Sequence, residues 1–378
     1  MAIEATDVFS RRARAVGDGR AAPGASRLLI VGSSMGSGHL TAARELARRA
    51  RHRGASVRVV DYLALPAGPQ GRLVRELYRR MVTHAPGLYD GIIRGWRAHP
   101  ALFERLSAVG EGAYINGLER EFAAFPPTAV ISTYNLAGQL LGRMRRGGRL
   151  DVPLIAYVTD AGAHPYWVSD GADLHLAPLS ATARALSDLG AARVQVVEPL
   201  VAAPAERSRS QARATLNLPP GRVALVNGGS WGVGAVRLAA GALGTSGTRT
   251  YVLCGQCERL ARAVRRLPGC HAVGWTDDVA AWIAAADVVV DSAGGTTCWE
   301  AIVAGRPVVL HRPLAGHGRL NAATLRDAGL VTVTQTDREL QSAVRSAPAA
   351  RPDLLPPAPD PAAVVLATAV SEPMAGRR

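Results

Sequence analysis

Short runs of β-branched and other apolar residues alternate along this chain with longer stretches in which apolar residues recur at helical spacing. Such runs favour strands that are buried on both faces of a parallel sheet. They lie at 27–31, 57–60, 129–132, 154–158, 174–177, 194–197, 223–226, 250–254, 286–290 and 308–310. Strands that alternate with helices in this way predict an α/β fold with doubly wound domains.

Two segments interrupt the alternation. The pattern over residues 65–125 predicts a long, mostly helical insertion, and residues 199–221 carry several prolines around a polar segment. Proline-rich polar segments are typical of domain boundaries. We therefore expect a first domain at 27–200, which carries the insertion, and a second at 201–345.

Both ends of the chain differ from the two domains in composition. Residues 1–26 are polar, Ala/Gly-rich and aperiodic, so we expect a disordered leader. Residues 346–378 form an Ala/Pro-rich tail in which Pro361–Val370 is compatible with one short helix. Such a tail could lie across the domain boundary.

The first strand runs directly into a glycine-rich loop that ends at His39. Its glycines at 32, 36 and 38 do not have G-x-G-x-x-G spacing, and the chain has no lysine for a Walker A loop. His39 stands where a helix begins. It could cap that helix, or it could act as a general base at the mouth of a cleft.

A second glycine turn follows the strand at 286–290. Gly294-Gly295-Thr296-Thr297 leads into a helix that Gly305 and Pro307 close. Glycines let a ligand approach the backbone, and a helix start presents unpaired N–H groups at a positive dipole end. The turn therefore predicts a phosphate site, and Glu300 on the first helical turn could reach a neighbouring sugar hydroxyl.

Two further loops follow predicted strands. Residues 228–234 form a glycine-rich loop that could bind a second anionic group. The strand at 154–158 ends in a polar loop that contains Asp160 and His164. Ligands meet such sheets at the carboxyl ends of strands, so these two side chains either orient an acceptor or brace their loop.

The insertion supplies apolar and basic residues together. An amphipathic, arginine-rich helix in its first half suits an anionic membrane surface, and packing on the core with a solvated arginine face fits equally well. Its apolar residues, which could also line a site for a hydrophobic acceptor, are Leu73, Val74, Leu77, Tyr78, Met81, Val82, Leu88, Tyr89, Ile92, Ile93, Trp96 and Phe103.

Charge and composition narrow the possible partners. The formal net charge is +14, and arginines supply it in both halves of the chain, so no single domain is marked as a nucleic-acid module. The four cysteines form neither a disulfide framework nor a paired zinc motif. No apolar run is long enough to span a bilayer, and the start lacks a signal peptide's apolar core. We expect a cytoplasmic protein that touches the inner membrane face at most peripherally.

Together, these features follow the logic of a nucleotide-sugar glycosyltransferase. The second half offers anion sites and an acid for a nucleoside diphosphate, and the first half offers a base for a hydroxyl acceptor. The chain offers no D-x-D pair for a metal, so backbone N–H groups would stabilise the departing diphosphate. We expect no cofactor and no metal, with a nucleoside-diphosphate sugar as a substrate.

The motifs also carry a family resemblance, which covers nearly all of residues 27–335. The chain resembles the GT-B glycosyltransferases of family 28, and most of all the monogalactosyldiacylglycerol synthase and processive diacylglycerol glucosyltransferase branch. The motifs that carry this resemblance are Gly36 to His39, Thr159-Asp160 with His164 to Trp167, Gly228 to Ser230, Cys254-Gly255, Gly274 to Thr276, Gly294 to Ala301 and Gly316 to Asn321.

The resemblance implies two Rossmann-like domains that face each other across a cleft, and a role for each motif. On the acceptor side it implies His39 and Asp160 as catalytic residues, with Gly36, Gly38, His164 and Trp167 as acceptor-binding residues. On the donor side it implies Trp275 and Thr276 for uracil, Glu300 for ribose, Gly229, Ser230, Gly294, Gly295 and Thr296 for the diphosphate, and His317 and Asn321 for the sugar.

Three positions depart from the family pattern. The lipid synthases usually have a proline at Gly295, a Gln-Glu pair at His317-Gly318 and a His-Pro at Tyr134-Asn135. Loss of the acid at Gly318 leaves the donor sugar open. We predict inverting hexosyl transfer from a UDP-sugar to a diacylglycerol-like acceptor. The alternatives are a polyprenyl-linked or natural-product acceptor, or a non-catalytic nucleotide-sugar-binding protein.

Overall fold

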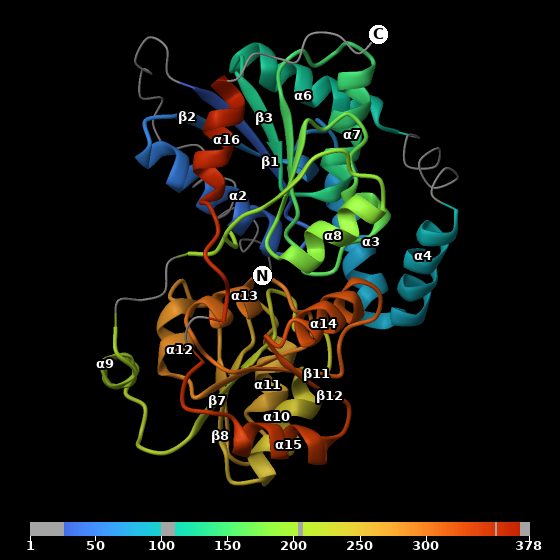
Figure 1. The fold of residues 1–378 in the computed structure, drawn as a ribbon. Helices are drawn as coiled ribbons and strands as arrows, with labels where there is room; N and C mark the ends of the chain where they lie inside the picture. The colour runs from blue at the N-terminus through green and yellow to red at the C-terminus, as the bar shows by residue number, and fades with distance from the viewer. Residues whose placement is uncertain (1–25, 100–109, 203–206, 352–353, 371–378) are drawn as a thin grey trace.

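The computed structural model describes residues 26–99, 110–202, 207–351 and 354–370. Most of the predicted leader therefore lies outside the described residues, as does Phe103 of the insertion. Two α/β domains are stacked end to end, with helices α13 and α14 at the top of the second domain facing the first (Figure 1). The prediction of two doubly wound α/β domains is confirmed.

The first domain is built on a six-stranded parallel sheet in the order β2-β1-β3-β4-β5-β6. Its strands are short, apolar and mostly buried, as parallel strands covered on both faces must be. They are β1 (Arg27–Gly32), β2 (Ser56–Asp61), β3 (Ala129–Ser132), β4 (Leu154–Tyr157), β5 (Leu174–Ala177) and β6 (Val194–Val196). The helices that cover them are α2 (Gly38–His52), α7 (Asn135–Arg146) and α8 (Ser180–Asp188), with a 3₁₀ turn η2 (Pro165–Trp167).

The second domain has a six-stranded parallel sheet in the order β12-β11-β10-β7-β8-β9. Its strands are β7 (Val223–Asn227), β8 (Arg249–Leu253), β9 (Cys270–Val273), β10 (Val288–Asp291), β11 (Val308–His311) and β12 (Thr332–Thr334). Its helices are α9 (Arg209–Thr215), α10 (Val236–Thr245), α11 (Glu258–Val264), α12 (Val279–Ala285), α13 (Thr296–Val303), α14 (His317–Asp327) and α15 (Asp337–Ser346).

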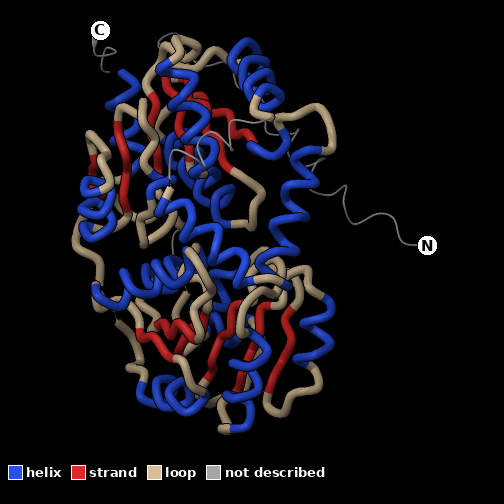
Figure 2. The backbone as a smooth tube through the Cα atoms, turned by 90° about the vertical axis from the view of Figure 1, so that its right-hand side faces the viewer, coloured by secondary structure: helices blue, strands red, loops and turns tan. Residues whose placement is uncertain are grey.

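Each sheet has one point at which the strand order reverses. In the first domain this point lies between β1 and β3, and in the second it lies between β7 and β10. Ligands bind outside the carboxyl ends of strands at such points. Helices and loops lie between the two sheets (Figure 2). Gly38 after β1 lies against Thr296 after β10, so both switch points open toward the domain junction.

The insertion of the first domain consists of a 3₁₀ turn η1 (Tyr62–Ala64) and the helices α3 (Gln70–His84), α4 (Pro86–Ala98) and α6 (Gly112–Ala124). Its apolar residues divide into two groups. Leu73, Leu77 and Leu88 are 66%, 66% and 61% exposed, whereas Tyr89 is only 8% exposed. Some of the apolar side chains predicted for the insertion are therefore exposed to solvent.

The tail returns to the first domain. Helix α16 (Pro361–Val370) runs beside α2 (Figure 1), and its residues Ala362 and Val365 are buried in the core on that face of the sheet. Glu198 N–H donates to the carbonyl of Pro359, which pairs the returning segment with the end of the first domain. The chain therefore crosses between the domains twice.

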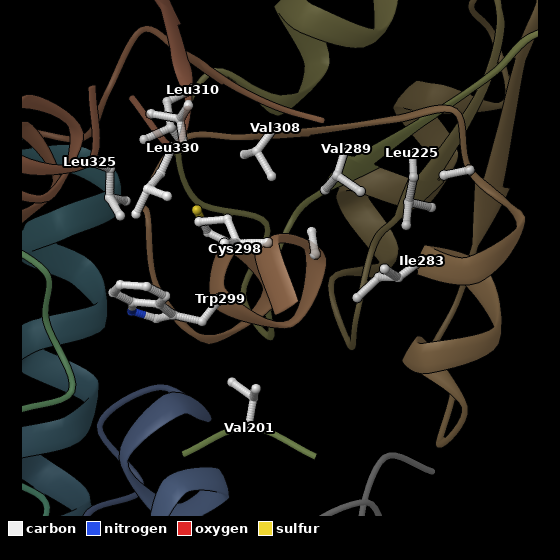
Figure 3. Packing of buried hydrophobic residues seen from close by; sticks show 14 of the residues in the cluster. Val201, Leu225, Ile283, Val289, Cys298, Trp299, Val308, Leu310, Leu325 and Leu330 are labelled. Atoms are coloured by element: carbon white, nitrogen blue, oxygen red, sulfur yellow. The ribbon is translucent and has the colours of Figure 1, made fainter. Parts of the chain in front are cut away.

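Helix α13 lies in the core that joins the second domain to the linker. Trp299 and Cys298 are buried beside Val308 and Leu310 of β11, and Val201 from the linker lies against the same helix (Figure 3). The helix that begins at the glycine turn is therefore held by packing on its apolar face.

Candidate functional site

His39 lies in the first turn of α2, at the switch point of the first sheet. Its Nδ1 lies 2.8 Å from the carbonyl oxygen of Thr133, which follows β3, and 3.1 Å from Thr159 Oγ1. A carbonyl can only accept, so Nδ1 carries the proton and donates it. This tautomer leaves the lone pair of Nε2 available for a proton from a substrate.

Burial lowers the pKa of His39, and the charge of Asp160 and the hydrogen bond to Thr133 oppose that shift only in part. A lowered pKa keeps the imidazole neutral at physiological pH. The position of His39 and its protonation state both suit a general base.

Asp160 follows β4 and is held by two donors from different domains. Its Oδ2 accepts from Trp167 Nε1 at 2.9 Å, and its Oδ1 accepts from Asn321 Nδ2 at 3.1 Å. Burial alone would raise the pKa of Asp160, but the imidazoles of His317, His164 and His39 outweigh it and hold the pKa below its usual value. Asp160 is thus an ionised carboxylate among three histidines.

His164 and Trp167, the predicted acceptor-binding side chains, are 5% and 2% exposed. Trp167 orients Asp160 through its indole N–H, and His164 lies beside Trp167 with 6.2 Å between ring centroids. Trp167 therefore contacts Asp160 directly, and His164 packs on Trp167.

Gly38 of the first loop lies at the contact between the two domains. A Cβ on Gly38 would come within 2.7 Å of Thr296 Oγ1, at the start of α13. Gly36 has φ +77° and open space around it. The loop that carries His39 therefore packs directly against the glycine turn of the second domain, and a side chain at position 38 would displace Thr296.

The turn between β10 and α13 is organised by Asp291, which is 4% exposed. Its carboxylate accepts from the N–H groups of Ser292 at 2.8 Å and Gly294 at 3.1 Å. Gly294 has φ +65°, a conformation that favours glycine, and Gly295 stands at the N-cap without a side chain. The first N–H groups of α13 are consequently left to a ligand.

The loop after β7 lies beside this turn. Asn227 reaches Asp291 at 3.3 Å and accepts from Gly229 N–H at 3.0 Å, so the two loops are linked. Gly229 is exposed with φ +58°, and Ser230 is half-buried. Both predicted diphosphate loops therefore stand at the switch point of the second sheet.

Glu300 is half-buried on α13. The sequence predicted Glu300 on the first turn of this helix. The helix begins at Thr296, so Glu300 lies on its second turn. Burial raises the pKa of Glu300 to about 7, and a hydrogen bond from Thr297 opposes the shift. Its carboxyl is therefore poised between charged and neutral near pH 7.

Trp275 and Thr276 lie at the edge of the second domain, after β9. Trp275 is 49% exposed, and its indole N–H donates to Asp277 at 3.2 Å. Thr276 Oγ1 accepts from Asp278 N–H at 3.1 Å. A large exposed aromatic ring on an ordered turn suits stacking with a base.

His317 and Asn321 occupy the first turns of α14. Asn321 is fully buried, donates to Asp160 and to the Ala293 carbonyl, and accepts from Gly162 N–H at 2.9 Å. The side-chain amide of Asn321 thus joins the two domains, and its contact with the donor sugar stays a prediction. His317 is half-buried, and its Nδ1 lies 2.8 Å from the hydroxyl of Tyr89.

Sequence reasoning missed Thr133 and Asp90, and it placed Tyr89 only among the apolar residues that could line an acceptor site. Thr133 fixes the tautomer of His39, and Tyr89 and Asp90 of α4 bind the loop before α14. These contacts join positions far apart in the chain, so no local pattern signals them. Within the described ranges, no group of three or more His, Cys, Asp and Glu side chains is arranged to hold a metal ion.

Three comparisons place this geometry among known proteins. The processive diacylglycerol β-glucosyltransferase of Bacillus pumilus is 21% identical over 339 residues, which cover 84% of this chain and 85% of that protein. The chloroplastic monogalactosyldiacylglycerol synthase 3 of Arabidopsis thaliana is 26% identical over 355 residues, with 84% and 73% covered. The crystal structure of TcCGT1 in complex with UDP superposes with a TM-score of 0.57 at 15% identity, with 91% and 93% covered.

The fold matches that of solved glycosyltransferases and is of the GT-B class. Residues 224–355 match the glycosyltransferase family 28 C-terminal domain, and the resemblance to family 28 is confirmed.

Proposed function

We propose that this protein is an inverting UDP-sugar hexosyltransferase that acts without a metal on a hydrophobic, diacylglycerol-like acceptor at the inner membrane face. The observation that supports the proposal is the contact between a loop of the first domain and a glycine turn of the second. The loop that ends at His39 approaches the glycine turn at the start of α13 so closely that a Cβ on Gly38 would lie 2.7 Å from Thr296 Oγ1. A neutral base and an anion site thus share one junction.

The donor half of the proposal rests on the second domain. The free N–H groups at the start of α13 and the Gly229-Ser230 loop are suited to a diphosphate, and Glu300 is near enough along α13 to accept from ribose hydroxyls. Exposed Trp275 offers a face for uracil. The structural relative TcCGT1 binds UDP with the same fold.

The chemistry follows from this arrangement. Nε2 of His39 takes the proton of the acceptor hydroxyl while its oxygen attacks the anomeric carbon. A new C–O bond forms on one face, and the C–O bond to the β-phosphate breaks on the other. The anomeric centre therefore inverts, and UDP leaves with the electron pair. Preorganised N–H groups stabilise the charge that develops on the diphosphate, an effect worth on the order of 3 kcal/mol per donor in other enzymes.

The acceptor half of the proposal rests on the outer surface of the insertion. Leu73, Leu77 and Leu88 are largely exposed there, and Arg72 and Arg80 stand among them. An apolar stripe with an arginine border fits the interface of an anionic membrane. Both relatives are named for diacylglycerol lipids. No helix in the described part of the chain is long and apolar enough to cross a membrane.

A donor panel tests the proposal. UDP-glucose, UDP-galactose and UDP-GlcNAc are each mixed with diacylglycerol in anionic vesicles, and release of UDP is followed with and without EDTA. We expect release from one donor above the others, dependent on acceptor and unchanged by EDTA. A folded protein that binds no UDP would refute the proposal.

A second candidate is a nucleotide-sugar-binding protein without turnover. The observation that favours it is Gly318, where the lipid synthases usually carry an acid. UDP bound with ordinary affinity and no release from any donor, over a broad acceptor panel that includes polyprenyl phosphates, would support this candidate.

A further inference from the structure

Helix α4 of the first domain reaches the loop that precedes α14 in the second. The carboxylate of Asp90 accepts from Gly316 N–H through Oδ1 at 2.9 Å and from Arg319 Nη1 through Oδ2 at 3.2 Å. The side chain of Asp90 is only 14% exposed. A charge-assisted bond on either side of His317 fixes the backbone of this loop.

The neighbouring residue of α4 fixes the side chain of His317. The hydroxyl of Tyr89 lies 2.8 Å from His317 Nδ1, and the rings meet edge to face with centroids 5.9 Å apart. Tyr89 is 8% exposed, and its hydroxyl is shared between His317 and the hydroxyl of Tyr78. With Nδ1 engaged, Nε2 is the ring nitrogen left to bond a hydroxyl of a substrate.

The adjacent position cannot supply a polar side chain of its own. A Cβ on Gly318 would lie 2.8 Å from Leu314 Cβ and 3.4 Å from the Ser292 carbonyl oxygen. The backbone here is therefore packed too tightly for an acid, and the polar groups that surround His317 come from the other domain.

We propose that Tyr89 and Asp90 are positioning residues for the hexose of the donor, a role that rests on the proposed function. Asp90 holds Gly316 and Arg319 at the start of α14, and Tyr89 orients His317 so that its Nε2 meets a sugar hydroxyl. The first domain thereby completes the donor-sugar site where the second domain lacks a carboxylate. The uridine diphosphate itself makes no use of these residues.

Because these residues are assigned to the hexose and not to UDP, variants of them should change binding of the UDP-hexose but not of UDP. The variants are Tyr89→Phe, which keeps the ring and removes the hydroxyl, and Asp90→Asn, which keeps the shape and removes the charge. The Kd for UDP and the KM for the best UDP-hexose are measured on the full chain. We expect the KM to rise at least fivefold in each variant while the Kd for UDP changes less than twofold.

Two matched variants remove a tyrosine hydroxyl and a carboxylate charge at positions away from His317, and they serve as controls. Tyr114→Phe alters a tyrosine that stacks on Tyr62 within the first domain, and Asp327→Asn alters an exposed acid that pairs with Arg326. Both should keep the wild-type KM, and a thermal melt of each variant checks folding.

The results distinguish a failure of this inference from a failure of the proposed function. A wild-type protein that binds no UDP overturns the proposed function and this inference together. Wild-type turnover with unchanged KM in both Tyr89→Phe and Asp90→Asn overturns the inference alone. An equal loss of UDP and UDP-hexose binding in the folded variants also overturns it, because general damage to the cleft would then explain the effect.

Discussion

Glu300 shows how the surroundings of a single residue set the pH at which it can work. Its pKa is raised by burial to about 7, so in the free protein its carboxyl is half ionised near neutrality. The ionised carboxylate accepts hydrogen bonds from the two ribose hydroxyls more strongly than the neutral acid does. Binding of UDP should therefore strengthen as pH rises through 7 and level off above it.

This expectation can be measured by titration calorimetry between pH 6 and pH 8. About a tenth of Glu300 is ionised at the lower pH and about nine-tenths at the higher, so affinity should rise by up to about tenfold. Glu300→Gln should bind UDP more weakly at pH 8. It should also lose the part of the pH dependence that comes from Glu300, while any part that comes from titration of the diphosphate remains. An identical pH dependence in both proteins would rule out the ribose contact.

At the scale of elements, the returning helix α16 is tied to α2 through Arg49. This guanidinium is 16% exposed and pairs with Glu45 at 2.7 Å, Glu198 at 3.1 Å and Asp360 at 3.4 Å. It also donates to the Val201 carbonyl at 3.0 Å. One side chain thus joins α2, both crossings between the domains and the start of α16.

Arg49→Ala should destabilise the fold by about 1–2 kcal/mol, because it removes the bond to the Val201 carbonyl and one bond from each of three acids, although Glu45 keeps Arg48 and Asp360 keeps Arg53. Arg48→Ala is the matched control, since Arg48 is 52% exposed and pairs only with Glu45. That exposed pair is worth less than about 1 kcal/mol. Thermal unfolding of the two variants makes the comparison, and equal midpoints would contradict the role of Arg49.

The exposed stripe on α3 makes a separate prediction about membrane contact. Leu73→Ser combined with Leu77→Ser should reduce co-sedimentation with anionic vesicles at least tenfold, since each leucine contributes about 1.5–3 kcal/mol when fully buried. Leu238→Ser, at a 43% exposed leucine of the second domain, should leave binding unchanged. Equal binding by all three proteins would place the contact on another surface.

The elements show why sequence predicted the fold better than the site. The strands and the turns at His39 and Gly294 follow from local patterns of apolar residues and glycine, and the predicted α/β fold is confirmed. The contacts of Asn321 with Asp160 and of Tyr89 with His317 span 161 and 228 positions. Local periodicity contains no information about such pairs, because they arise only when the two domains meet.

At the scale of the whole molecule, the two domains divide the proposed reaction between them. The first provides His39 with its tautomer fixed by Thr133, and the second provides the glycine turn before α13. Neither half is complete alone, since the loop before α14 is held by α4 of the opposite domain. The central claim is that this junction transfers a hexose with His39 as the base.

The most direct test compares sugar transfer by the wild-type protein and by His39→Ala. Labelled UDP-hexose is incubated with diacylglycerol in anionic vesicles, and the label recovered in extracted lipid is counted beside the Kd for UDP. We predict that His39→Ala loses transfer by about 10²–10⁴-fold, the usual contribution of a general base, while UDP binding stays within about twofold. Near-normal transfer by His39→Ala would contradict the account.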